Sequence, residues 1–297
     1  MSGQLRWDRE GRIWPHRTAS TFVSIGSPAP GPTWHVQRMG TAGKPRLLLL
    51  HGTGASVHSW RGLMPILARD YDVIAPDLPR HAFTTGHSLN VMSLPRMAHA
   101  VDGMLTELDF APDIIAGHSA GAAIALQLAL DHGYTGPIVG LNSALRPFSG
   151  PAAQMFPTLA KLLFVNPFVP RVFSAAAGLA GGIDGFLKRA TGSNIDAQGV
   201  ACYSALLKNS RHTEGALAMM ANWDLPALRE RMQEIANPVL LIHSDNDAAI
   251  PLDWAREADS WLPNSRLEIV RGHGHLLHEE SPAKVADIMR PFVKEAI

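Results

Sequence analysis

The stretch Gly117-His118-Ser119-Ala120-Gly121 decides the fold. It follows the apolar run Ile114-Ile115-Ala116 and precedes Ala122–Leu130, a stretch of helical composition. A serine between two glycines, where a strand turns into a helix, is the pattern of a nucleophile elbow. The sharp turn strains the serine backbone, so the residues beside it must be small. The pattern predicts that the Ser119 hydroxyl stands exposed above a sheet, at a helix N-terminus that favours developing negative charge.

A serine nucleophile needs a base, an acid that orients the base, and donors for the oxyanion. In open α/β sheets such groups gather at the carboxyl ends of the strands. Asp245 and Asp247 both follow the apolar stretch Pro238–His243, whereas the preceding strand ends at Asn142 and Ser143 and offers no carboxylate. We expect Asp247 to be the acid, because it stands in the Asp-x-x-Ile-Pro register of such enzymes. Asp245 is the alternative and is expected to shape the turn.

The base is expected on a loop after the last strand, where His273, His275 and His278 follow one another closely. The chain has 14 histidines, so only a histidine in an expected position carries weight. His275 has the Gly-His-x-x-His-Glu-Glu-x-Pro spacing that ends at the start of a helix, and we prefer it to His273. His278 is expected to cap or pack against that helix. A neutral imidazole held by a carboxylate can act as a base, and Asp247 is predicted to hold His275.

Two backbone N–H groups are expected to bind the oxyanion. One belongs to Ala120, which follows the nucleophile, and the other to the glycine-rich turn His51-Gly52-Thr53-Gly54, where Thr53 is our choice. His118 is expected to be a packing residue that points away from the base. The chain order of serine, aspartate and histidine is the order found in α/β-hydrolases.

The apolar runs predict an α/β fold, with strands that alternate with helices. The strands are expected at residues 21–25, 34–38, 47–50, 72–75, 114–116, 137–141, 238–243 and 267–270. This alternation favours a mostly parallel central sheet with helices on both faces, here the α/β-hydrolase fold. Residues 145–225 lack strand patterns and are predicted to be an inserted helical cap. Residues 1–144 and 226–297 then form the α/β-hydrolase core.

Composition excludes several classes of function. The formal net charge is zero, which gives no electrostatic case for a nucleic-acid partner. Cys202 is the only cysteine, as in proteins of a reducing compartment, and neither a signal peptide nor a transmembrane stretch is visible. We therefore expect a cytoplasmic protein, with peripheral contact to a membrane as a further option. No metal-ligand spacing or phosphate loop is found, so neither metal nor cofactor is expected.

The whole chain resembles an α/β-hydrolase with a helical cap, and it is similar to the magnesium-chelatase accessory proteins of bacteriochlorophyll biosynthesis. The stretches that carry the closer resemblance are Trp7–Arg12 with Trp14-Pro15, Trp34–Gly40, Leu47–Trp60, Ala75–Pro79 and Gly117–Ala122. The resemblance implies a role around magnesium insertion into protoporphyrin, with contact to magnesium chelatase. One departure is Pro79-Arg80-His81-Ala82, where the superfamily often has Pro-Gly-His-Gly. It predicts a reshaped pocket rim and argues against a standard small-ester substrate.

These observations predict a serine hydrolase of the esterase type that acts on an ester or related acyl bond. Large apolar residues between Phe148 and Phe173, with Met219, Met220 and Trp223, indicate a small apolar substrate, with porphyrins among the candidates. Two alternatives stay open. One is a non-catalytic accessory protein that binds porphyrin or the chelatase. The other is a cofactor-free haloperoxidase or C–C hydrolase that uses the same triad. The oligomeric state stays open too.

Overall fold

The computed structural model describes residues 4–26, 31–146 and 182–297. The strands within these ranges are β1 (Ser20–Ser24), β2 (Thr33–Met39), β3 (Arg46–Leu50), β4 (Asp72–Pro76), β5 (Ile114–His118), β6 (Ile138–Leu141), β7 (Val239–Ser244) and β8 (Ser265–Val270). They form one sheet in the order β1-β2-β4-β3-β5-β6-β7-β8. The strand β2 runs antiparallel to both of its neighbours, and every pair from β4 to β8 is parallel. The predicted mostly parallel sheet is confirmed.

Helices cover both faces of this sheet. They are α1 (Met64–Leu67), α2 (Leu94–Glu107), α3 (Ala120–His132), α10 (Leu252–Trp261), α11 (Leu277–Glu280) and α12 (Pro282–Ala296). Short 3-10 helices lie at η1 (Glu10–Ile13), η2 (Arg17–Ala19), η3 (Val57–Trp60), η4 (Leu89–Met92) and η5 (Met232–Glu234). The apolar spacing of Trp60, Leu63, Ile66 and Leu67 predicts a helix from Trp60 to Ala68. The helix is shorter than this, because η3 ends at Trp60 and α1 begins only at Met64.

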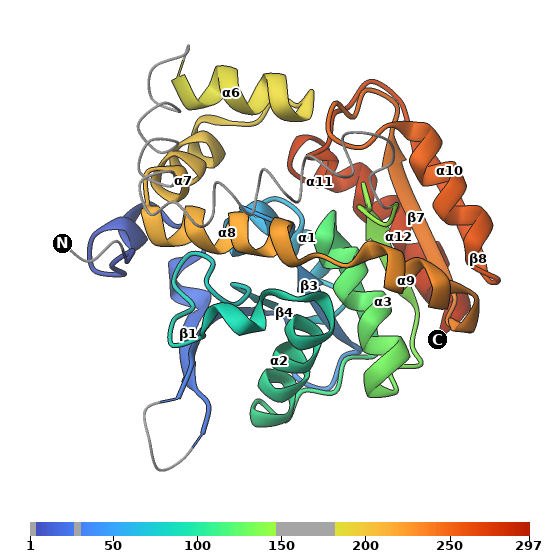
Figure 1. Ribbon diagram of the computed structural model, residues 1–297, viewed down its shortest axis with the longest axis horizontal. Coiled ribbons are helices and arrows are strands. Elements are labelled where there is room, and N and C mark those ends of the chain that lie inside the picture. The colour runs from blue at the N-terminus through green and yellow to red at the C-terminus, as the bar shows by residue number, and fades with distance from the viewer. Residues whose placement is uncertain (1–3, 27–30, 147–181) are drawn as a thin grey trace.

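Two hydrophobic cores lie on opposite sides of the sheet, because side chains alternate along each strand. Leu48 and Leu50 of β3 belong to the core that includes residues of α2 and α3. Leu47 and Leu49 belong to the core that includes residues of α1 and α12. Figure 1 shows α2 and α3 side by side on one face. A strand buried on both faces reads as a continuous apolar run, which is why Leu47–Leu50 could be predicted.

A helical segment is inserted between β6 and β7. Its described helices are α6 (Gly182–Thr191), α7 (Ala197–Leu207), α8 (Ser210–Asn222) and α9 (Leu225–Arg231). Figure 1 shows α6, α7 and α8 grouped together on one side of the molecule. The predicted helical insertion is confirmed for 182–231, whereas the domain boundaries at 145 and 225 remain predictions. The apolar residues from Phe148 to Phe173 lie outside the described residues.

The N-terminal segment packs against the body through its two tryptophans. Trp14 is buried, and both Trp7 and Trp14 contact the ring of Phe83 edge-on at 4.8 Å. Across the ranges that the structure describes, no helix is long and apolar enough to cross a bilayer.

Candidate active site

Ser119 lies at the turn between β5 and α3 in a strained backbone conformation, with φ 53° and ψ −115°. Such a conformation costs about 1–3 kcal/mol and persists only where the surroundings enforce it. Glycine is required on both sides. A Cβ on Gly117 would lie 2.3 Å from the carbonyl carbon of Gly121, and a Cβ on Gly121 would lie 2.1 Å from the Leu50 oxygen. The helix therefore packs against the strands closely enough to hold the serine in its strained turn.

Asp247 and His275 meet at the carboxyl ends of β7 and β8. His275 donates from Nδ1 to Oδ2 of Asp247 at 2.7 Å, and Asn142 donates to the same oxygen at 2.8 Å. The other oxygen, Oδ1, accepts the N–H groups of Ala249 and Ile250, each at 2.8 Å. Burial alone would raise the pKa of Asp247, but the bonds and charge of His275, with the other donors, outweigh it and lower the pKa. Asp247 is thus held ionised as an acceptor for the imidazole.

The alternative acid and the alternative base have other partners. Asp245 accepts the N–H of Gly272 at 2.7 Å and so shapes the turn, as expected. His273 lies with Nδ1 4.0 Å from Oε2 of Glu280. His278 is fully buried in α11. Of the carboxylates and imidazoles considered from the sequence, the geometry brings Asp247 and His275 together.

Asn142, a residue with no carboxylate that was not expected to take part in the site, also belongs to this arrangement. It directly follows β6 and has a φ of 44°, and its Nδ2 also donates to the Ser244 hydroxyl at 2.7 Å. Ser244 in turn donates to the carbonyl of Gly274 at 2.5 Å. These bonds join the end of β6, the Asp247 loop and the loop that carries His275. The only signal in the sequence was a polar residue at a strand end.

His118 does not point away from the base, and that prediction is wrong. Its Nε2 donates to the carbonyl oxygen of His275 at 2.9 Å, and the two rings lie 4.7 Å apart. The reason is the alternation of side chains along β5, which sends His118 toward α11, where its ring lies 4.3 Å from that of His278. Burial, with the nearby His275, lowers the pKa of His118 to about 3, so its ring is neutral.

A cavity of about 180 Å³ lies against Ser119 and His275. Its floor includes Thr53, whose loop passes close to the serine, since a Cβ on Gly52 would lie 3.0 Å from the Cβ of Ser119. Ala120, the other predicted oxyanion donor, is the first residue of α3. Within the described ranges no hydrogen bond joins the Ser119 hydroxyl to His275; such bonds often form only when substrate is present.

Comparison with known proteins identifies the family. The sequence model of the alpha/beta hydrolase family matches residues 47–288. The chain belongs to the α/β-hydrolase family. It is 41% identical over 266 residues to the magnesium-chelatase 30 kDa subunit of Rhodobacter capsulatus, an alignment that covers 90% of this chain and 91% of that protein.

This α/β-hydrolase is also similar to an esterase in sequence and to a lipase in structure. A pimeloyl-[acyl-carrier protein] methyl ester esterase of Aromatoleum aromaticum is 29% identical over 271 residues, which cover 84% of this chain and 99% of the esterase. The crystal structure of a putative lipase from Acinetobacter baumannii superposes with a TM-score of 0.76 at 21% identity. That superposition covers 100% of this chain and 97% of the lipase chain, and it shows the fold.

The departure at Pro79-Arg80-His81-Ala82 places side chains where the backbone favours glycine. Arg80 has a φ of 62° and Ala82 a φ of 41°, both in the left-handed region. Arg80 forms an ion pair with Glu214 of α8 and donates to the carbonyl of His87 at 3.1 Å. This α/β-hydrolase therefore uses the position as an attachment point for the inserted helices.

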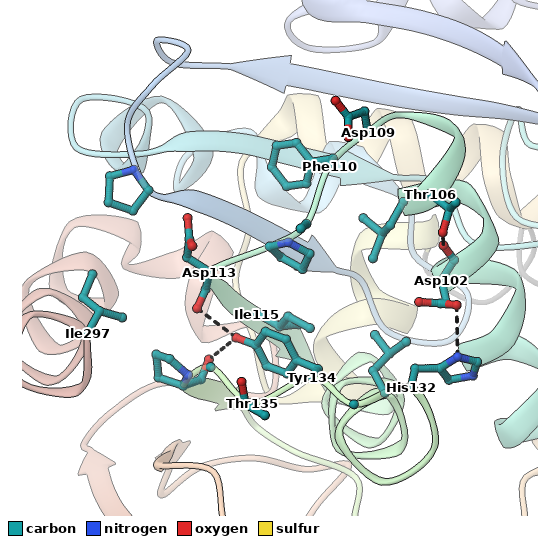
Figure 2. Close-up of a pocket in the computed structure, with 18 of the residues that line it drawn as sticks. Asp102, Thr106, Asp109, Phe110, Asp113, Ile115, His132, Tyr134, Thr135 and Ile297 are labelled. Carbon is teal, nitrogen blue, oxygen red and sulfur yellow. Dashed lines mark hydrogen bonds and ion pairs between the residues drawn. The ribbon is translucent and has the colours of Figure 1, made fainter.

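A larger cavity, of about 900 Å³, lies away from the serine among the loops that precede β5 and β6. Figure 2 shows its polar groups bonded to one another. The Tyr134 hydroxyl lies 3.2 Å from the Asp113 carbonyl and 2.8 Å from that of Pro137, and His132 pairs with Asp102 at 3.0 Å. None of the predicted site residues lines it. The smaller cavity at Ser119 is therefore the candidate active site of this α/β-hydrolase.

Proposed function

We propose that this α/β-hydrolase is a serine hydrolase that cleaves an ester or a related acyl bond. The observation that carries the proposal is the 2.7 Å bond between His275 Nδ1 and Asp247 Oδ2, since His275 and Ser119 line the same cavity. An ionised Asp247 accepts the hydrogen bond from Nδ1–H, which keeps the proton on Nδ1 and leaves the lone pair of Nε2 free to act as a base. Membership of a family with many hydrolases supports the same conclusion.

The proposed reaction follows from these roles. The Ser119 oxygen attacks the carbonyl carbon while Nε2 of His275 takes the hydroxyl proton. The carbonyl oxygen becomes an oxyanion that the N–H groups of Thr53 and Ala120 bind. His275 then gives its proton to the leaving group as the bond to it breaks. Water, deprotonated by His275, releases the acyl group and restores the Ser119 hydroxyl. Each oxyanion donor is expected to contribute about 10²–10³ in turnover.

The walls of the cavity support an apolar substrate. The helices α6 and α7 contribute Phe186, Leu187 and Leu207 to it, and no charged side chain in the described ranges lines it. Pockets that enclose a drug-sized ligand measure about 300–1,000 Å³. The cavity is smaller, so we propose that it receives the acyl or ester arm of a larger molecule. With the chelatase subunit as a relative, we propose an ester-bearing tetrapyrrole of bacteriochlorophyll biosynthesis.

A fluorophosphonate probe tests the nucleophile directly. The folded protein should form one covalent adduct on Ser119, and Ser119→Ala should abolish it. Ser265→Ala is a matched control, since that hydroxyl, at the start of β8, donates to the Asp259 carbonyl of α10 and should leave labelling unchanged. Folded wild-type protein that does not react with the probe, and is indistinguishable from Ser119→Ala, would contradict the proposal.

The second candidate function is a non-catalytic accessory protein that binds porphyrin or magnesium chelatase. The 41% identity to a magnesium-chelatase subunit over 90% of the chain favours it. Complementation of a deletion strain separates the two functions. If Ser119→Ala restores pigment synthesis as well as wild type does, binding suffices for the pathway role. If wild type restores it and Ser119→Ala does not, binding alone is wrong.

A further inference from the structure

A buried histidine, His51, binds the peptide group between Gly52 and Thr53 in the loop that carries Thr53. His51 donates from Nδ1 to the carbonyl of Gly52 at 2.8 Å, and that carbonyl belongs to the same peptide group as the Thr53 N–H. The Ala55 N–H donates to the same oxygen at 3.1 Å. The other nitrogen of His51 accepts the N–H of Leu78 at 2.9 Å. Because a peptide group is planar, fixing the Gly52 oxygen also fixes the direction of the Thr53 N–H.

Two more histidines hold Gly54, the next residue. Its N–H donates to Nε2 of His81 at 3.2 Å, and its carbonyl lies 3.1 Å from Nε2 of His212. Nδ1 of His212 accepts the N–H of Ala82 at 3.1 Å, so the proton of this ring lies on Nε2 and the ring donates to Gly54. Nδ1 of His81 lies 3.0 Å from the carbonyl of Pro79. Three successive peptide groups around Thr53 are thus each bound by one imidazole.

All three rings must be neutral for this arrangement, since each uses one nitrogen as a donor and the other as an acceptor. Burial, followed by the neighbouring imidazoles, lowers the pKa of His51 well below its usual value and that of His212 to about 3. Burial also lowers the pKa of His81 to about 4. The bonds therefore persist through the neutral pH range.

His212 belongs to α8 of the inserted segment, whereas the loop it binds follows β3 in the body. The helix is packed tightly against the body here, since a Cβ on Gly215 would lie 2.5 Å from the Arg80 carbonyl oxygen. The ion pair between Arg80 and Glu214 is formed at the same contact. The Thr53 hydroxyl also donates to Sδ of Met219 at 3.4 Å. The α8 helix is consequently in contact with the residue proposed to bind the oxyanion.

We propose that His212 is a positioning residue, through which helix α8 sets the orientation of the Thr53 N–H for oxyanion binding. This inference rests on the proposed hydrolase function. The hydrogen bond from His212 to the Gly54 carbonyl lies one residue away from the Thr53 N–H, the group proposed to bind the oxyanion. A displacement of about 1 Å in such a group costs about 10² in rate, while ground-state binding of the substrate changes little. The inserted segment thus supplies part of the machinery for turnover as well as a wall of the cavity.

Three substitutions separate the bond to Gly54 from the other contacts of the ring. His212→Phe keeps a ring and removes both hydrogen bonds. His212→Asn keeps an acceptor near the Nδ1 position, for Ala82, and lacks the donor to Gly54. His212→Gln keeps a donor near the Nε2 position, for Gly54. The substrate is p-nitrophenyl butyrate, and an aryl trifluoromethyl ketone reports on the oxyanion, because its adduct with a serine carries one.

We expect His212→Phe and His212→Asn to lower kcat about 10- to 100-fold with KM within about twofold of wild type. Affinity for the trifluoromethyl ketone should fall in parallel with kcat. His212→Gln should retain kcat within about threefold. If the His212→Phe variant does not fold, the kcat of His212→Asn compared with that of His212→Gln tests the role of the bond to Gly54. A kcat that is unchanged in His212→Phe and His212→Asn, or equal in His212→Asn and His212→Gln, would overturn the role of the bond to Gly54.

A measurement without turnover separates this inference from the proposed function. The backbone amide resonances of Thr53 and Gly54 are recorded by ¹⁵N NMR for the wild type and the three variants. The Thr53 resonance should shift in the Phe and Asn variants and return in the Gln variant. If this pattern appears while the wild type neither hydrolyses the ester nor reacts with the fluorophosphonate, the proposed function fails and the positioning by α8 stands. Unshifted Thr53 resonances in all variants would overturn the positioning.

Discussion

The amide of Asn142 and the carboxylate of Asp247 are joined at 2.8 Å through Oδ2, the same oxygen that accepts Nδ1 of His275. A carboxylate bound by two side-chain donors and two backbone N–H groups is fixed in its rotamer. It therefore holds the imidazole in one orientation. Asn142 takes part in this without touching the base itself.

Replacement of Asn142 by Ala should weaken both the fold and the proposed catalysis. A hydrogen bond to a charged group contributes about 1.5–3 kcal/mol, so the free energy of unfolding should fall by about that amount at pH 7. The bond favours ionised Asp247, whose pKa is lowered, so the difference from wild type is full above about pH 4 and shrinks as the pH falls further. Urea unfolding of both proteins across this range measures it. An unchanged midpoint at pH 7 would contradict the role given to Asn142.

The two aspartates of the β7 loop should differ sharply in their effect on turnover. Asp247→Asn removes the charge that stabilises the imidazolium and allows the wrong tautomer of His275, so kcat should fall about 10²–10⁴-fold. Asp245→Asn should change kcat less than about threefold, because the hydrogen bond that the Asp245 carboxylate accepts in the described part of the chain comes from the Gly272 N–H and not from His275. Initial rates of hydrolysis of one ester by the two variants and the wild type measure this difference. Equal losses in the two variants would reject Asp247 as the orienting acid.

Two glycine substitutions test the close packing of the elbow. Gly121→Ala would place a Cβ 2.1 Å from the Leu50 oxygen, so α3 must move away from β3. We expect a loss of about 1–3 kcal/mol in stability, together with loss of fluorophosphonate labelling. Gly103→Ala in α2 is the control, because its Cβ would meet nothing within 4 Å. It should stabilise the protein by about 1 kcal/mol, measured by thermal unfolding.

Acid should destabilise this protein well above pH 4, near which an ordinary aspartate or glutamate protonates. The pKa of His118 and that of His212 are lowered to about 3, whereas a histidine in the unfolded chain takes a proton near pH 6.5. At these two rings the unfolded state then binds more protons, so their contribution to stability is full above pH 6.5 and falls as the pH drops toward 4. Near pH 5 each such ring contributes about 1.4 kcal/mol per pH unit. His212→Gln should reduce the measured slope by about that amount, and an unchanged slope would contradict the burial of a neutral ring.

The fold was predictable because its inner parallel strands are buried on both faces and appear as apolar runs such as Leu47–Leu50. The Asp247–His275 contact followed from local registers at strand ends, which the topology brings together. The predicted helix from Trp60 to Ala68 was partly wrong, because apolar spacing does not distinguish a 3-10 turn from an α-helix.

The supporting contacts could not be predicted, because they join residues far apart in the chain. Asn142 and Asp247 are 105 residues apart, and Gly54 and His212 are 158 residues apart. No periodicity or short motif reports such a contact. His118 was predicted with the wrong orientation for a related reason: the alternation of side chains along β5 sets its direction, but which loop and helix lie on that side of the strand is a tertiary property.

The contact between His212 and Gly54 bears on how proteins of this family diversify. Inserted segments are natural units to exchange when a new substrate preference is sought. In this chain a chimaera that replaced residues 182–231 would also remove one of the three imidazoles around Thr53. Selectivity and rate would then change together. An exchanged segment that retains a hydrogen-bond donor opposite the Gly54 carbonyl is expected to change selectivity without changing rate.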